Sequence, residues 1–130
     1  MKVPEGFEWV LATGLAINFH SFLQAEAVAF GRAKFFPKEF MEKEFGQVHQ
    51  EQLGEEIQGG GYPDTGSGLY SHKLSYKDWY KFNILQRCHL NYLENLPIVL
   101  TSLVSAGLYD PKKASIVGAA YLFFRRSEER

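Results

Sequence analysis

Three polar residues in an otherwise apolar stretch have the types and spacing of a binding site for a zwitterionic ligand. Arg87, Asn91 and Glu94 are separated by four and three residues, so on an α-helix all three side chains project from one face. Arg87 and Glu94 are then about 10 Å apart along the helix axis, too far to satisfy each other. A ligand with a carboxylate near Arg87, an ammonium near Glu94 and a peptide-like amide near Asn91 would match all three. An equally good interpretation is interhelical ion pairing with one of Arg32, Arg125 or Glu26.

Other chemistries receive little support from the sequence. A single cysteine, Cys88, excludes an internal disulfide and a cysteine-built zinc site, and His49 and His72 lack neighbours at ligand spacing, so no metal site is expected. The glycine run 59–61 is not followed by the Gly-Lys-Ser/Thr of a phosphate-binding loop. With 14 basic and 15 acidic residues, the chain has a net charge of −1, so no nucleic-acid partner is expected. No catalytic residue can be assigned.

The elements that must position these residues are three charge-free segments, 9–25, 95–109 and 114–124. A membrane-spanning helix needs about 20 mostly apolar residues, and each segment approaches that length only when its charged flanks are included. We expect helices at about 6–34, 78–107 and 111–126, with Asp78 as the N-cap of the second. Hydropathy alone favours three membrane-spanning helices and the core helices of a soluble bundle equally.

A polar connector, residues 37–77, separates the first two expected helices. From Pro37 to Asp78 the chain has four basic and eight acidic residues. The segment Lys38 to Leu53 has the pattern of a short amphipathic helix, and a glycine-rich loop follows it. The mean hydropathy of −0.23 therefore averages an acidic connector with three apolar segments.

The second expected helix resembles a known family. Its residues 82–97, Phe-Asn-Ile-Leu-Gln-Arg-Cys-His-Leu-Asn-Tyr-Leu-Glu-Asn-Leu-Pro, are similar to the signature of the MAPEG family, membrane-associated proteins of eicosanoid and glutathione metabolism. The similarity extends to Gly31-Arg32-Ala33-Lys34-Phe35, to the turn at 107–112 and to 118–125. It favours the membrane interpretation over the soluble bundle.

The resemblance implies an all-α integral membrane protein of one domain, residues 1–130, that assembles as a homotrimer in contact with membrane lipid. It implies that glutathione binds at the positions of Arg32, Arg87, Asn91 and Glu94, with Arg125 as an additional contact. The expected activity is conjugation of lipophilic electrophiles or reduction of lipid hydroperoxides, with glutathione as substrate and no metal. The endoplasmic reticulum and the mitochondrial membrane are the expected locations.

The chain also departs from the family pattern. The family's third helix continues into a tyrosine-bearing stretch, whereas here Arg125 is followed by Arg126-Ser127-Glu128-Glu129-Arg130, and the connector is longer than usual. We therefore expect a MAPEG-like bundle with three transmembrane helices, truncated after the third, so that the family's fourth is missing. The alternative function is a catalytically inactive accessory subunit of a larger membrane complex, for example a mitochondrial respiratory one.

Overall fold

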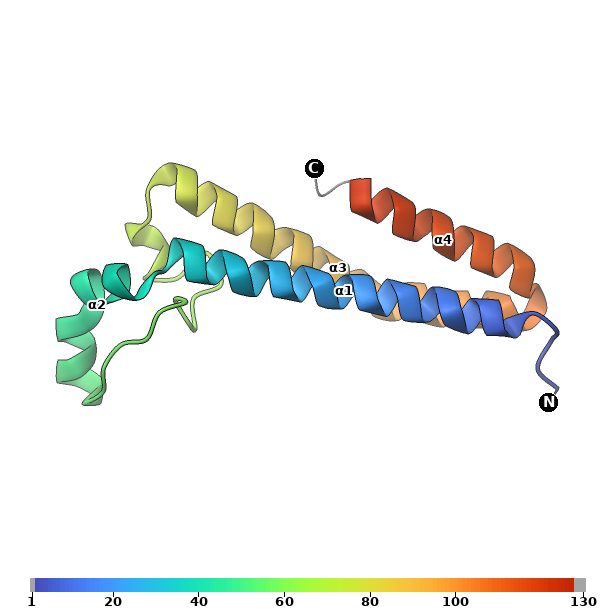
Figure 1. Ribbon diagram of the computed structural model, residues 1–130, viewed down its shortest axis with the longest axis horizontal. Coiled ribbons are helices and arrows are strands. Elements are labelled where there is room, and N and C mark those ends of the chain that lie inside the picture. Colours follow the sequence, from blue (N-terminus) through green and yellow to red (C-terminus); the bar gives the residue numbers. More distant parts are fainter. Residues whose placement is uncertain (1, 128–130) are drawn as a thin grey trace. The chain divides into compact units, whose positions relative to one another are not determined.

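The computed structural model describes residues 2–127, except for the side chains of residues 126 and 127, and this part of the chain is helical without strands. Figure 1 traces its four α-helices, α1 (Phe7–Phe35), α2 (Lys38–Leu53), α3 (Tyr76–Tyr109) and α4 (Pro111–Ser127), and a single 3-10 turn, η1 (Ser71–Lys73), precedes α3. The all-α expectation is confirmed. The expected number of helices is corrected from three to four, because the amphipathic segment in the connector forms α2.

The expectation of membrane-spanning helices is wrong for the described residues. None of their helices combines the length and the apolar character that a span requires. In α1 the polar residues His20, Gln24 and Glu26 interrupt the apolar sequence, and α3 carries Arg87 and Glu94 within its length. α4 has 17 residues, so it is about 26 Å long at 1.5 Å per residue, short of the roughly 30 Å hydrocarbon core.

Local chemistry sets the bounds of the helices. Pro37 separates α1 from α2, and α2 ends before Gly54, whose positive φ of 73° turns the chain out of the helix while its N–H still donates to the Gln50 carbonyl at 3.0 Å. At the start of α3 the N-cap is Ser75 and not Asp78. The Ser75 carbonyl accepts the first helical hydrogen bond, from Trp79 N at 2.8 Å, and its hydroxyl accepts from Asp78 N at 3.2 Å. Asp78 instead supports this cap, because its carboxylate accepts a hydrogen bond from the same hydroxyl at 2.7 Å.

The chain divides into two compact units, and each is described by itself. The terminal unit comprises residues up to Gln24 and from Leu90 onward, and the connector unit comprises Ala25–His89. The terminal unit has a core of Val10, Ile17, Tyr92, Leu103 and Ala114. The connector unit has a largely aromatic core of Phe36, Met41, Phe45, Ile57 and Phe82.

Only the first half of α2 packs against the core of the connector unit. Met41 and Phe45 are its buried residues, and they join the aromatic core on one side of the helix. In the second half of α2 the apolar residues Val48 and Leu53 are 57% and 65% exposed. The connector is therefore anchored by the start of α2 and by the chain that returns from Gly54 to α3.

Candidate functional site

Arg32, in the last turn of α1, is the most completely bonded of the predicted site residues. Its side chain is only 5% exposed. One terminal nitrogen, Nη1, donates to the carbonyls of Gly60 at 3.2 Å and Gly61 at 3.4 Å, and Nη2 donates to the Asp64 carbonyl at 2.6 Å. The guanidinium carbon lies 4.0 Å from the centre of the Tyr62 ring, a cation–π arrangement. Arg32 therefore binds the connector's own backbone.

The carboxylate of Asp64 organises the next part of this loop. Its Oδ1 accepts from Gly66 N at 2.7 Å, Gly68 N at 2.9 Å and the Ser71 hydroxyl at 2.8 Å, and its Oδ2 accepts from Ser71 N at 2.7 Å. Burial by itself raises the pKa of Asp64, but these hydrogen bonds together outweigh it and hold the pKa below its ordinary value. Asp64 is therefore an ionised structural centre around which residues 64–71 fold.

The beginning of α3 fixes the same loop from the other side. The Gly66 carbonyl accepts from Trp79 Nε1 at 3.1 Å and from Asn83 Nδ2 at 2.8 Å. Phe82, the residue before Asn83 on α3, is fully buried, and its ring centre lies 5.5 Å from the Arg32 guanidinium carbon. This arrangement was not predicted from the sequence, although an aspartate followed by glycines two and four residues later is typical of such a turn.

Arg87 has the opposite environment within the same connector unit. Its side chain is exposed, and it forms no hydrogen bond or ion pair with the residues that the structure describes. It follows Gln86, a buried residue whose side chain faces the interior of the unit. The guanidinium of Arg87 is therefore available to an anionic ligand, whereas that of Arg32 is occupied.

Asn91 and Glu94 belong to the terminal unit and are also exposed on α3. Within the described part of the chain, their side chains have no hydrogen-bond or ion-pair partner. The predicted interhelical ion pair of Glu94 is thus absent from the described residues. Both remain free to bind a ligand.

Arg125 lies in an aromatic cluster of the terminal unit. It is half-buried, and its guanidinium carbon lies 5.0 Å from the centre of the Tyr92 ring. The Tyr92 hydroxyl donates to the Ile17 carbonyl at 3.0 Å, and the His20 ring lies 5.4 Å from the Tyr92 ring. Tyr92 stands between Asn91 and Glu94 in the sequence, so Arg125 packs against the turn of α3 that carries both.

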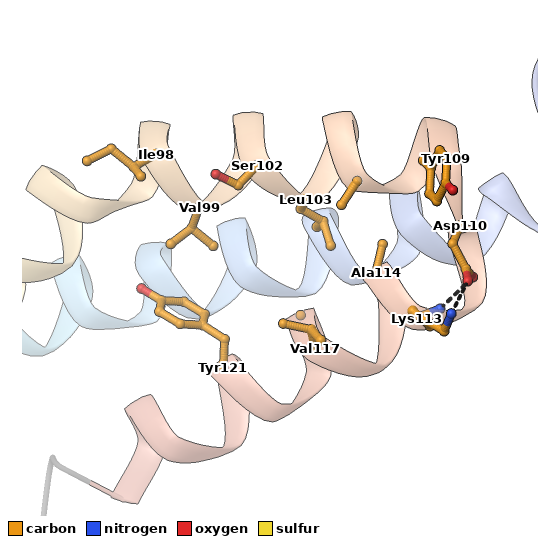
Figure 2. A pocket seen from close by; sticks show the side chains of 12 residues that line it. Ile98, Val99, Ser102, Leu103, Tyr109, Asp110, Lys113, Ala114, Val117 and Tyr121 are labelled. Carbon is orange, nitrogen blue, oxygen red and sulfur yellow. Dashed lines mark hydrogen bonds and ion pairs between the residues drawn. The ribbon is translucent and has the colours of Figure 1, made fainter.

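A groove between α3 and α4 is a feature of the terminal unit that was not predicted from the sequence. Figure 2 shows its apolar walls, with the Asp110–Lys113 ion pair of 3.0 Å at one end and Tyr121 at the other. Its volume is about 490 Å³, within the range of small-molecule sites. Such a groove can hold an apolar molecule. The lining includes Ile98, Val99, Leu103, Ala106, Ala114 and Val117.

The predicted site residues are thus divided between the two units. Arg32 and Arg87 lie in the connector unit, and Asn91, Glu94 and Arg125 lie in the terminal unit. Among the residues that the structure describes, no three His, Cys, Asp or Glu side chains are grouped as metal ligands would be.

Comparison with known proteins gives one clear result. The model of the MAPEG family matches residues 9–126, which is most of the chain. No curated protein and no solved structure matches the chain significantly.

Proposed function

Since this chain belongs to the MAPEG family, we propose that it binds glutathione for conjugation of lipophilic electrophiles or reduction of lipid hydroperoxides. The family covers glutathione-related transferase and peroxidase-type proteins. The observation that carries the proposal is the exposure of Arg87, Asn91 and Glu94 on α3, with side chains that bind nothing in the described part of the chain. We also propose that the chain acts as microsomal glutathione S-transferase 3 does, a family member that residues 82–97 on α3 resemble.

The chemistry of glutathione matches these three side chains. Glutathione has two carboxylates, one α-amino group and two peptide amides. Arg87 would bind a carboxylate through its two-pronged guanidinium, Glu94 would bind the ammonium, and Asn91 would bond an amide between them. Arg125 would add a positive charge beside the same stretch of α3.

The reaction requires glutathione as its thiolate. Nearby positive charge lowers a thiol pKa and favours that form. In conjugation, the thiolate sulfur forms a bond to an electrophilic carbon and the leaving group departs with the bonding electrons. In peroxide reduction, two glutathione molecules are oxidised to their disulfide while the hydroperoxide becomes an alcohol and water. The groove between α3 and α4 suits the apolar part of either second substrate.

Among the predicted glutathione contacts, Arg32 is the one whose surroundings least favour binding of a ligand. Three backbone carbonyls already accept from its guanidinium, and the side chain is buried. We propose that its role is to position the connector, while Arg87 receives the ligand in that part of the chain.

The family also supports a location and partners. MAPEG family members are membrane proteins, and we propose that this chain fractionates with membranes of the endoplasmic reticulum or the mitochondrion, in contact with membrane lipid. By resemblance it would assemble as a homotrimer.

A second function is favoured by the state of Arg32. In the family, the position of Arg32 is expected to contact the ligand, but here its guanidinium binds the chain's own loop. This use of Arg32 is consistent with a protein that has a structural role and no catalytic one. In this alternative the chain is a catalytically inactive accessory subunit of a larger membrane complex.

Calorimetric titration of the detergent-purified chain with glutathione separates the two functions. Binding should be saturable, and it should be lost in Arg87→Met and Glu94→Gln but kept in Lys43→Gln, a matched change at an exposed residue of α2. Turnover of a chlorinated aromatic electrophile or a lipid hydroperoxide should likewise be lost in Arg87→Met and Glu94→Gln and kept in Lys43→Gln. No heat and no turnover, with migration in a large complex on a native gel, would support the accessory subunit instead.

A further inference from the structure

The first turns of α3 carry an exposed strip of aromatic and apolar residues. Tyr76 is 77% exposed, Tyr80 is 52% exposed and Ile84 is 48% exposed. Residues four positions apart lie one above the other on a helix, and the rings of Tyr76 and Tyr80 are indeed stacked with centres 6.2 Å apart. The strip lies entirely within the connector unit.

Lysines border this strip. Lys77 and Lys81 are exposed, and each is one position after a tyrosine, so they form a parallel row about 100° around the helix. Lys73, in η1, is exposed just before α3. None of the three forms an ion pair with the described residues. Between 71 and 90 the chain has four basic residues and one acidic residue, a local surplus of three in a chain of net charge −1.

The side of α3 away from the strip packs against the core of the connector unit. Phe82 is fully buried, and Trp79 and Asn83 bond the Gly66 carbonyl. The one acidic residue, Asp78, is bound by the Ser75 hydroxyl at 2.7 Å. Within the described residues Asp78 forms no ion pair with these lysines, so the outward-facing strip keeps a surplus of positive charge.

An anionic bilayer surface is the partner that satisfies both parts of this face. Tyrosine rings favour the headgroup level of a bilayer, and lysine stems lie along apolar surface while the ammonium reaches outward to phosphate. A hydrated polyanion such as RNA would use the lysines, but it would leave Ile84 without an apolar partner. The combination therefore favours lipid.

We propose that the face formed by Lys73, Tyr76, Lys77, Tyr80, Lys81 and Ile84 binds anionic phospholipid headgroups at a membrane surface. The proposal rests on the membrane location in the proposed function, and it adds the surface and the class of lipid. It requires no contribution from the residues proposed to bind glutathione.

The fluorescence of Trp79 can test this directly, because its ring lies 5.9 Å from that of Tyr76. The background variant is Trp9→Phe, which leaves Trp79 as the sole tryptophan. This variant is reconstituted into phosphatidylcholine vesicles that contain a minor fraction of brominated lipid, either phosphatidylserine or phosphatidylcholine. Bromine quenches tryptophan at short range, so a brominated lipid bound beside Tyr76 should quench Trp79, and stronger quenching by the brominated phosphatidylserine is the expected result.

Two matched double variants assign the preference to the lysines. Lys77→Gln with Lys81→Gln should lower the preference for the anionic lipid by up to about thirtyfold, which corresponds to about 1 kcal/mol for each lysine. Lys38→Gln with Lys43→Gln removes two exposed lysines of α2 and should leave the preference unchanged.

Equal quenching by the two brominated lipids would overturn the proposal, as would an unchanged preference in the Lys77/Lys81 variant. Displacement of Trp79 from both lipids by a single-stranded oligonucleotide would assign the face to nucleic acid instead. Glutathione titration of the same reconstituted protein reports separately on the proposed function. A chain that binds glutathione without lipid preference refutes only the surface, and a chain with lipid preference but no glutathione binding refutes only the function.

Discussion

Replacement of Arg32 by Met should release the glycine-rich loop of the connector while leaving the helices folded. Methionine keeps most of the apolar stem but removes three hydrogen bonds, at 2.6, 3.2 and 3.4 Å, and the cation that lies 4.0 Å from the Tyr62 ring. A hydrogen bond that involves a charged group contributes about 1.5–3 kcal/mol. Because such terms are not additive and the longest of the three is weak, we expect a loss of about 3 kcal/mol. This corresponds to an opening equilibrium shifted roughly 150-fold toward the released loop.

Amide hydrogen exchange measures this opening where it occurs. Gly60 N donates to the Phe36 carbonyl at 2.7 Å, and Asp64 N donates to the Gly61 carbonyl at 2.9 Å, so both amides are reporters. In Arg32→Met, peptides that cover residues 59–70 should lose protection, and peptides from the middle of α1 and α3 should keep theirs.

Arg87→Met is the matched control, because the same residue type in the same unit is there exposed and unbonded to described residues. It should leave the protection of the loop unchanged and abolish glutathione binding. Unchanged protection in Arg32→Met would refute the view that Arg32 holds the connector. Equal losses in both variants would show that the effect is general and not local.

Three further predictions concern the same unit. The pKa of Asp64 is lowered, so the stability that it contributes is present above the ordinary pKa of an aspartate and is lost as the pH falls below about 4. Pepsin cleavage of the loop, normalised to an unstructured peptide, should therefore accelerate below that pH, and Asp64→Asn should abolish this acid step. Gly61→Ala should lower the free energy of unfolding by roughly 2–4 kcal/mol, because Gly61 has a φ of +64° and an added Cβ would lie 2.5 Å from Phe36 Cγ. Gly54→Ala, with a φ of +73° and nothing within 4 Å, should cost only about 1–2 kcal/mol in the same circular-dichroism melt. Ser75→Ala should destabilise the first turn of α3 by about 1 kcal/mol and speed amide exchange there.

The sequence predicted the local structure better than the environment of each helix. Pro37 and Gly54 flank α2, so the amphipathic segment could be placed from its hydrophobic pattern and from these two helix-breaking residues. The expected membrane spans were wrong for different reasons in different helices: the span in α3 had to be extended through Arg87 and Glu94, and in α1 uncharged polar residues were not counted as interruptions. Uncharged polar residues such as His20 and Gln24 in α1 lower the hydropathy of a window without breaking a charge-free run.

The role of Arg32 could not be predicted from sequence, because its partners are 28 to 32 residues away along the chain. Each of these hydrogen bonds is to a backbone carbonyl. Because every residue has a backbone carbonyl, a sequence pattern cannot show which ones will accept from Arg32. The resemblance assigned Arg32 by its position in a motif, and position alone carries no information about burial. Only the aspartate and glycines of residues 64–68 gave a local signal, and it indicates a turn rather than the arginine that the turn surrounds.

The contrast between Arg32 and Arg87 bears directly on the function. For a ligand carboxylate to bind Arg32, it would have to replace three carbonyl acceptors and displace the Tyr62 ring, whereas Arg87 would lose only its hydration. A charged hydrogen bond gained in place of one already made yields little net free energy, since binding is the difference between the two states. Glutathione affinity in this chain should therefore depend on Arg87, Asn91 and Glu94. A binding-competent chain in which Arg32→Met loosens the loop and leaves affinity intact would establish that the two arginines have separate roles.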